Sequence, residues 1–337
     1  MAKIKVVVTD FIEPDLDWEV KHSKELGIEF QYFQLKQANP DQLLTVIHDA
    51  DVVIVNMAKI TAEVITGLKK CRLIIRHGIG YDNVDIEAAT AKQIMVGYVP
   101  DYCISEVAEQ AVTLIMACQR KLPQQIKIIE RSSQIGQWDF TPINPIFSMR
   151  GKTVAIIGFG RIGRTVFQML QGFGVNFRIV DPYLGDAIKQ QYGINVVSLE
   201  TALQEADVVT IHCPLRWEET YHMFDMPQFR MMKKTATLIN TARGGIVNLD
   251  ALDIALNEGL LSMAGIDVYE VEPPPADFPL LRNPRAICAP HLSWLSEESG
   301  WNIRHKIMKD VERFLQGLSP LNQVNKEIEI TQSLETP

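Results

Sequence analysis

Three short stretches in the second half of the chain carry side chains that transfer protons or bind carboxylates. They are "INTARGG", "IDVYEVEPP" and "APHLSW", which contain Arg243, Glu272 and His291. The unperturbed pKa of histidine lies near neutrality, so His291 can act as a general acid and base. Glu272 can orient that imidazole and stabilise its charged form. The guanidinium of Arg243 can hold a carboxylate in a forked geometry.

A glycine-rich turn in the middle of the chain has the pattern of a dinucleotide site. Gly158, Gly160 and Gly163 form GxGxxG in "TVAIIGFGRIGRTVFQML", after a strand-like run and before a helical pattern. The first glycine permits a tight turn, the second lets backbone N–H groups approach a pyrophosphate, and the third lets helix and strand pack closely. The positive end of the helix dipole then faces the phosphates. A tight turn without a ligand is the alternative.

The next strand-like segment favours the dinucleotide site over that alternative. "NFRIVD" ends in Asp181, 23 residues after Gly158, where a carboxylate accepts hydrogen bonds from an adenosine ribose. Asp181 also repels a 2′-phosphate, and Pro182 and Tyr183 beside it in the sequence offer no guanidinium for one. The combination predicts NAD as the cofactor, in preference to NADP.

Each candidate catalytic residue, taken alone, has an ordinary structural explanation. A histidine after proline is often a structural cap, an arginine a surface salt bridge, and a glutamate a solvated loop residue. Here the three follow an NAD fingerprint in order. Because ligands of open α/β sheets bind outside the carboxyl ends of the strands, we expect a catalytic set there, in a crevice between domains.

Two series of short apolar segments must position these groups. The first half contains "IKVVVT", "ADVVIVN", "CRLIIR" and "IMVGYV", and the second half contains "TVAIIG", "NFRIVD", "DVVTIHCP", "ATLINT", "MAGIDV" and "AICAP". Short β-branched strands that alternate with helical patterns indicate parallel α/β sheets. Helical stretches are predicted from Ser105 over "SEVAEQAVTLIMACQRKLPQQIKIIE" and over Glu297–Leu315. The first is apolar around much of its circumference, which predicts a buried partner, with burial inside its own subunit as the alternative.

The composition limits the classes of function. A length of 337 residues predicts two domains. A net charge of −8 argues against a nucleic-acid partner, because phosphate binding depends on clustered Lys and Arg. No stretch approaches the roughly 20 apolar residues of a membrane span, so a cytoplasmic protein without a membrane partner is expected. The five cysteines form no CxxC pair, which predicts reduced thiols and no metal site.

The set "GFGRIG", "DP", "NTARGG", "DVYEVEP" and "PHLSW" resembles the D-isomer-specific 2-hydroxyacid dehydrogenase family, which includes phosphoglycerate, glycerate and D-lactate dehydrogenases. The resemblance runs from about Val6 to Asn325. It implies that Arg243, Glu272 and His291 are catalytic. It also implies NAD contacts at the pyrophosphate, ribose, adenine and nicotinamide from Gly158, Gly160, Arg161, Ile162, Gly163, Asp181, Cys213, Pro214, Thr241, Ala242, Arg243, Asp267 and His291.

The resemblance also explains why about 150 residues precede the glycine turn. In this family a Rossmann NAD domain is inserted into a flavodoxin-like substrate domain, so the expected fold is α/β with two doubly wound parallel-sheet domains. Residues 1–102 and 296–337 would form the substrate domain, and residues 103–295 the NAD domain. A homodimer built on the NAD domain and the helix from Ser105 is implied as well.

The first half contributes a candidate substrate loop. In "RLIIRHGIGYDNVD", Gly78 and Gly80 follow a strand, and the N–H groups of Ile79 and Gly80 can cradle a carboxylate, with a plain turn as the alternative. The resemblance makes this the substrate-carboxylate loop, with additional charge from Arg76. It also implies a second substrate-facing loop around Met57.

Apolar side chains are expected around the rest of the substrate. Met57, Tyr81 and Trp294 predict an uncharged, partly apolar substrate side chain, with packing of Trp294 in a hinge between domains as the alternative. The prediction is an NAD-dependent oxidoreductase that interconverts a small 2-oxo acid and its D-2-hydroxy acid, with hydride transfer at C2 and His291 as acid/base. A dinucleotide-sensing scaffold is the alternative function, because "PHLSWLSEES" is also similar to the C-terminal-binding-protein branch of the family.

Overall fold

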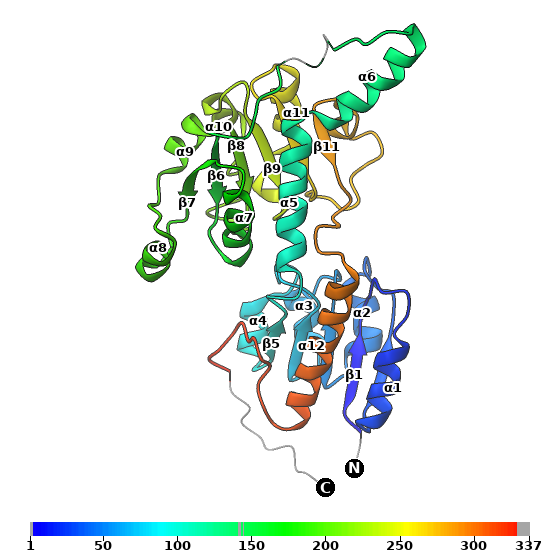
Figure 1. The fold of residues 1–337 in the computed structure, drawn as a ribbon. Coiled ribbons are helices and arrows are strands. Elements are labelled where there is room, and N and C mark those ends of the chain that lie inside the picture. The colour runs from blue at the N-terminus through cyan, green and yellow to red at the C-terminus, as the bar shows by residue number, and fades with distance from the viewer. Residues whose placement is uncertain (1–2, 141–142, 144, 329–337) are drawn as a thin grey trace. The chain divides into compact units, whose positions relative to one another are not determined.

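The chain forms two compact units, each built on a parallel sheet with helices on both faces (Figure 1). The computed structural model describes residues 3–140, 143 and 145–328. Unit 1 comprises Met1–Tyr102 and Ser296–Pro337, and unit 2 comprises Cys103–Leu295. The predicted fold class is confirmed. None of the helices within the described ranges is long and apolar enough to cross a membrane.

Among the described residues, unit 1 contains a five-stranded sheet with the flavodoxin-like order β2-β1-β3-β4-β5. Its strands are β1 (Lys5–Val8), β2 (Glu29–Tyr32), β3 (Val52–Val55), β4 (Leu73–Arg76) and β5 (Met95–Tyr98). Local sequence patterns predict all of these except β2. This edge strand reads "EFQY" and is only partly buried, so it lacks the apolar run that reveals the inner strands.

Helices cover both faces of this sheet. On one face, α2 (Pro40–Ile47), α3 (Ala62–Gly67) and α4 (Ile86–Ala91) pack on alternate strand residues. On the other lie α1 (Asp17–Glu25) and α12 (Glu297–Leu315), the helix that returns from the far end of the chain (Figure 1). The bounds of α12 are those predicted.

A buried ion pair joins the returning helix to the first one. Arg304 of α12 donates hydrogen bonds of 2.6 and 2.5 Å to the carboxylate of Glu19 in α1. Both side chains are buried. The last helix is therefore an integral part of unit 1, although it lies some 200 residues beyond the rest of that unit in the sequence.

The described part of unit 2 contains a six-stranded sheet of order β11-β10-β9-β8-β6-β7. Its strands are β6 (Thr153–Ile157), β7 (Asn176–Val180), β8 (Val208–Ile211), β9 (Thr237–Asn240), β10 (Met263–Ile266) and β11 (Ala286–Cys288), all of them predicted. Beyond β7, Val196 forms an isolated parallel bridge with Ile179. The order is therefore that of a Rossmann sheet whose third strand is reduced to this bridge.

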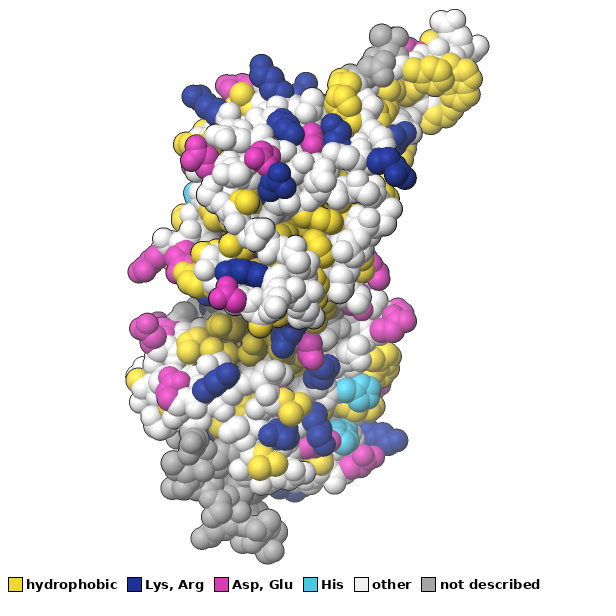
Figure 2. Space-filling view, turned by 60° about the vertical axis from the view of Figure 1, so that its left-hand side comes forward, with side chains coloured by type: hydrophobic (Ala, Val, Ile, Leu, Met, Phe, Trp, Pro, Cys, Tyr) yellow, Lys and Arg dark blue, Asp and Glu magenta, His cyan; other side chains and the backbone are white. Residues whose placement is uncertain are grey.

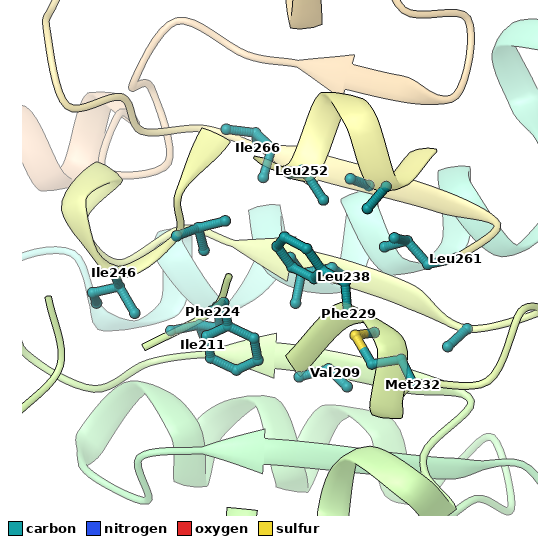
Figure 3. Close-up of a cluster of buried hydrophobic side chains, with 14 of the residues drawn as sticks. Val209, Ile211, Phe224, Phe229, Met232, Leu238, Ile246, Leu252, Leu261 and Ile266 are labelled. Atoms are coloured by element: carbon teal, nitrogen blue, oxygen red, sulfur yellow. The ribbon is translucent and has the colours of Figure 1, made fainter. Parts of the chain in front are cut away.

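Separate hydrophobic cores cover the faces of the second sheet. Figure 3 shows the first, in which inner-strand residues such as Val209, Ile211 and Leu238 meet side chains from the helices of that face. These helices are α9 (Leu199–Glu205), α10 (Met226–Met231) and α11 (Leu249–Asn257). On the opposite face pack α5 (Ile104–Gln119) and α7 (Arg161–Gln171). Unit 2 also contains α8 (Asp186–Tyr192) and the 3-10 helices η2 (Gly244–Ile246) and η3 (Pro279–Arg282).

The helical stretch predicted from Ser105 is divided. α5 ends at Gln119, and α6 (Leu122–Ile135) begins after Lys121, whose φ of 50° is left-handed. Pro123 lies in the first turn of α6, where proline is tolerated because its missing N–H has no helical partner. The periodic pattern crosses this break, and only the proline marks it in the sequence.

The apolar residues of α5 pack inside their own subunit. Leu114, Ile115 and Cys118 are buried against α7 and the sheet. Burial of these residues therefore needs no second subunit, in line with the alternative of internal burial, and the homodimer remains a prediction. Large exposed apolar side chains occur instead on α6 and just after it: Leu122, Ile126, Ile129, Ile135, Trp138 and Phe140.

Candidate active site

The glycine turn joins β6 to α7 as predicted. Gly158 has a φ of +91°, and a Cβ there would come within 2.6 Å of the backbone nitrogen of Cys213. A Cβ on Gly163 would come within 2.2 Å of the Gly158 carbonyl oxygen, so neither position accepts a side chain. Beside Gly160, in contrast, no other described residue would lie within 4 Å of a Cβ. This open space at the N-terminus of α7 fits a pyrophosphate.

The predicted ribose and adenine contacts surround the same turn. Asp181 accepts hydrogen bonds from the backbone N–H groups of Phe159 (2.8 Å) and Tyr183 (3.1 Å), which hold its carboxylate beside the glycines. Cys213 and Pro214 follow β8, and the backbone of Cys213 lies against Gly158. Burial raises the pKa of the Cys213 thiol to about 12, so the side chain remains neutral. Arg161 and Ile162 form the first turn of α7.

Thr241 and Ala242 lie after β9, where the nicotinamide is expected. Asn240 shapes this turn: its side chain accepts the Ala242 N–H (3.0 Å) and donates to the Arg243 carbonyl (2.9 Å). The hydroxyl of Thr241 is buried and has no hydrogen-bond partner among the described residues. Because an unsatisfied buried hydroxyl is costly, this site fits a polar ligand group such as the nicotinamide carboxamide.

Glu272 and His291, which the sequence predicts to act as an acid–base pair, lie within hydrogen-bond distance of each other. Nδ1 of His291 lies 2.7 Å from Oε2 of Glu272, and Oε1 of Glu272 accepts the Tyr269 N–H at 2.9 Å. Burial would raise the pKa of Glu272, but the hydrogen bond and charge of His291, the Tyr269 N–H and the charge of Arg243 lower it below its ordinary value. Since Nδ1 is directed at a carboxylate, Nε2 is the nitrogen that can exchange a proton with a substrate.

Arg243 is brought to this pair by close backbone packing. A Cβ on Gly244 would come within 2.0 Å of the Tyr269 carbonyl carbon, so the Arg243 turn packs directly on the backbone that leads to Glu272. The turns after β9, β10 and β11 thus bring Arg243, Glu272 and His291 together at one edge of the sheet.

Asp267 supports the loop that carries His291. It is fully buried, and its carboxylate accepts the N–H groups of Leu292 (3.1 Å) and Ser293 (3.0 Å) together with the Ser293 hydroxyl. Trp294 donates its indole N–H to the His291 carbonyl (2.9 Å). This supporting role is additional to the nicotinamide contact predicted for Asp267, which remains a prediction.

The loop around Met57 is held by residues that the sequence analysis did not select. The buried carboxylate of Asp10 accepts the N–H groups of Asn56 (3.3 Å), Met57 (2.7 Å) and Ala58 (3.2 Å). Asn83 donates to the carbonyls of Asn56 (3.0 Å) and Ala58 (2.9 Å). Nothing local in the sequence marks Asp10 or Asn83, because both lie more than twenty residues from the loop they hold.

The candidate carboxylate loop follows β4 in unit 1. Arg76 folds back over Gly78 and donates to the His77 carbonyl, and a Cβ on Gly78 would overlap the Arg76 guanidinium. The N–H groups of Ile79 and Gly80 donate to no backbone carbonyl within the described ranges. Their role in binding a carboxylate remains a prediction.

A buried hydrogen-bonded pair precedes this loop. Oε1 of Glu13 lies 2.8 Å from Nε2 of His77, and each side chain is 9% exposed. Burial would raise the pKa of Glu13, but the hydrogen bond and charge of His77 and nearby backbone N–H groups lower it to about 2. This pair joins the segment after β1 to the start of the candidate carboxylate loop.

We expect Glu13→Gln to destabilise the protein in a pH-dependent way. Because the folded-state pKa of about 2 lies below the ordinary 4.5, the carboxylate contributes at most about 3 kcal/mol above pH 4.5, and this is lost as the pH falls towards 2. Thermal melting should show a clear difference from wild type at pH 7 and a smaller one at pH 3. Glu25→Gln, at an exposed partner of His22, is the control. A difference independent of pH would contradict the assignment.

The fold and the site define a dinucleotide-dependent oxidoreductase, and comparison with known proteins identifies its family. Residues 112–293 match the NAD binding domain of the D-isomer specific 2-hydroxyacid dehydrogenases. The chain is 36% identical to a glyoxylate reductase of Korarchaeum cryptofilum over 80% of each protein. It is 30% identical to a hydroxypyruvate reductase of Blautia hydrogenotrophica over 96% of this chain and 100% of that one. The chain belongs to the D-isomer specific 2-hydroxyacid dehydrogenases.

Further relatives agree with this class. A D-3-phosphoglycerate dehydrogenase of Archaeoglobus fulgidus is 36% identical over 81% of this chain, which spans about half (51%) of that protein. The solved structure of D-lactate dehydrogenase from Aquifex aeolicus, complexed with NAD and lactic acid, has a TM-score of 0.82 and 25% identity, covering 95% of this chain and 99% of that one. The protein is an NAD-dependent enzyme that interconverts 2-oxo and 2-hydroxy acids.

Proposed function

We propose that this enzyme reduces a small, unphosphorylated 2-oxo acid to its D-2-hydroxy acid. The observation that carries the proposal is the 2.7 Å Glu272–His291 pair beside Arg243, at the edge of a sheet whose glycine turn fits a dinucleotide. The names of two relatives, glyoxylate reductase and hydroxypyruvate reductase, support a small substrate without phosphate. A cytoplasmic location, where NADH and 2-oxo acids are available, is part of the proposal.

NADH, which the glycine turn and Asp181 would hold, would be the source of the hydride for C2 of the substrate. His291, held through Nδ1 by Glu272, gives the proton on Nε2 to the substrate oxygen as the alkoxide develops, and takes up another from solvent afterwards. Glu272 stabilises the protonated imidazole, and Arg243 polarises the carbonyl and binds the carboxylate. Oxidation of the hydroxy acid runs through the same groups in reverse.

We assign part of the substrate binding to unit 1 and cofactor binding to unit 2. The N–H groups of Ile79 and Gly80, with Arg76, would bind the substrate carboxylate. Met57 and Trp294 would contact the substituent on C2. The support is the available N–H groups of the first loop, the fixed backbone around Met57 and the attachment of Trp294 to the His291 loop.

Kinetics on a panel of 2-oxo acids test this function. We expect NADH oxidation with glyoxylate, hydroxypyruvate, pyruvate and longer apolar acids to exceed that with 3-phosphohydroxypyruvate. Trp294→Ala should reduce kcat/KM about tenfold on the longer apolar acid and less on pyruvate, because a pocket wall contributes about 1–2 kcal/mol of apolar contact. Equal losses on both acids would show that Trp294 has a purely structural role. A wild-type preference for the phosphorylated acid would refute the proposed substrate class.

We also propose a homodimer, built on the apolar face of α6. Leu122, Ile126 and Ile129 follow one another at helical spacing and are 48%, 55% and 48% exposed. Trp138 and Phe140 stack at 5.7 Å just after the helix and add to the same exposed apolar surface. Figure 2 shows hydrophobic side chains gathered over α6. Exposed clusters of this kind commonly form protein interfaces.

Light scattering tests the dimer. Wild type should have the mass of two chains at micromolar concentration, and Ile126→Asp with Ile129→Asp should have the mass of one, because a buried unpaired carboxylate is costly at an interface. Ile254→Asp on α11 is a matched control, since Ile254 is similarly exposed (49%) but lies outside this surface. A monomeric wild type, or a dimeric double variant, would contradict the proposed interface.

A further inference from the structure

A cation lies beside the Asp181 loop although Pro182 and Tyr183, which follow Asp181, carry none. Arg216 belongs to the loop after β8, yet its guanidinium carbon lies 4.8 Å from the centre of the Tyr183 ring. The backbone N–H of Tyr183 donates to Asp181 at 3.1 Å. Arg216 therefore packs on the short loop that begins with the carboxylate predicted to bind the ribose.

The backbone of this arginine is fixed, while its side chain can move. Thr220 accepts the Arg216 N–H at 2.7 Å and donates to the Pro214 carbonyl at 2.8 Å. The guanidinium forms a 3.0 Å ion pair with Glu219, but the two side chains are 49% and 46% exposed. Exposed pairs of this kind are weak because water screens them, so the guanidinium can exchange Glu219 for a stronger anion.

A phosphate dianion is such an anion, because arginine binds phosphate through paired charge-assisted hydrogen bonds. A 2′-phosphate on a ribose bound at Asp181 would be repelled by that carboxylate and attracted by the nearby guanidinium. We propose that Arg216 is a second determinant of cofactor choice, a binding group for a 2′-phosphate that Asp181 opposes and Glu219 restrains. The proposal concerns the cofactor site of the proposed function and rests on it.

The charge arrangement has a specific consequence. The wild-type enzyme prefers NADH, because Asp181 favours the free ribose hydroxyls and repels a phosphate. Removal of Asp181 does more than abolish this preference, because Arg216 is already in place to bind the phosphate. Without Arg216, removal of Asp181 only reduces repulsion. The effects of the two residues on a 2′-phosphate are therefore coupled.

A double-mutant cycle with cofactor fragments measures this coupling. Isothermal titration calorimetry would give Kd values for 5′-AMP and for adenosine 2′,5′-bisphosphate, which differ only at the 2′ position. The proteins are wild type, Asp181→Ala, Arg216→Ala and the double variant. We expect Asp181→Ala to improve binding of the bisphosphate relative to 5′-AMP about tenfold when Arg216 is present, and less than about threefold when it is absent. Glu219→Gln should raise the ratio of bisphosphate affinity to 5′-AMP affinity about threefold.

Arg178→Ala is the matched control, because Arg178 pairs with Glu205 in the same unit through a comparable exposed ion pair. It should leave the ratio unchanged. If Asp181→Ala raised the bisphosphate affinity relative to 5′-AMP equally with and without Arg216, the proposal would be overturned. Absence of 5′-AMP binding in wild type would overturn the adenosine site itself. The proposed substrate chemistry is tested separately by steady-state kinetics, which this binding measurement does not involve.

Discussion

Replacement of His291 by alanine is expected to lower kcat for 2-oxo acid reduction by at least about a hundredfold, with the Kd for NADH nearly unchanged. Proton transfer from Nε2 neutralises the alkoxide that develops when C2 accepts the hydride. Alanine removes this donor. The cofactor contacts at the glycine turn and Asp181 do not involve the imidazole, so binding of NADH should persist. Steady-state kinetics and fluorescence titration with NADH separate the two effects.

The chain offers a matched control for this variant. His222 also forms a hydrogen bond with a glutamate of the same unit, 2.9 Å from its Nε2 to Oε1 of Glu270. Because that Nε2 is already engaged, His222 has no role in the proposed proton transfer, and His222→Ala should change kcat by less than about threefold. Similar losses in the two variants would contradict the assignment of His291.

Arg243→Ala should have the other large effect, lowering kcat/KM for the 2-oxo acid about a thousandfold through both a higher KM and a lower kcat. The guanidinium is proposed to bind the carboxylate in the ground state and to stabilise the oxygen that becomes negative in the transition state. Both interactions disappear together. The KM for NADH should change little, since the predicted NAD contacts around Thr241 and the glycine turn remain.

Arg243→Lys tests the geometry of this interaction. Lysine keeps the charge but lacks the planar fork. We therefore expect the kcat/KM of Arg243→Lys to exceed that of Arg243→Ala by less than about tenfold. Thermal melting would confirm that both variants are folded. Full recovery by lysine would show that Arg243 acts through charge alone, and a loss confined to the KM for NADH would move its role to the cofactor.

Local sequence patterns predict the inner part of both sheets. The runs that form β3 and β8 are apolar at every position because both faces of a central parallel strand are covered. The edge strand β2 has no such run and was missed. The division between α5 and α6 was also missed, since apolar spacing continues across Lys121. Periodicity reports which face is buried, and is insensitive to a short interruption of the backbone.

The sequence by itself determined which residues are candidates for the chemistry of the site. The glycine turn, Asp181 and the residues Arg243, Glu272 and His291 are recognisable because each follows a strand-like segment of a parallel sheet, whose carboxyl ends lie at one edge. The tertiary structure alone decided which distant groups meet them. Asp10 reaches the Met57 loop because β1 lies beside β3, and Arg216 reaches Tyr183 from the loop after β8. Strand order is a property of the whole sheet, so contacts that depend on it leave no local pattern in the sequence.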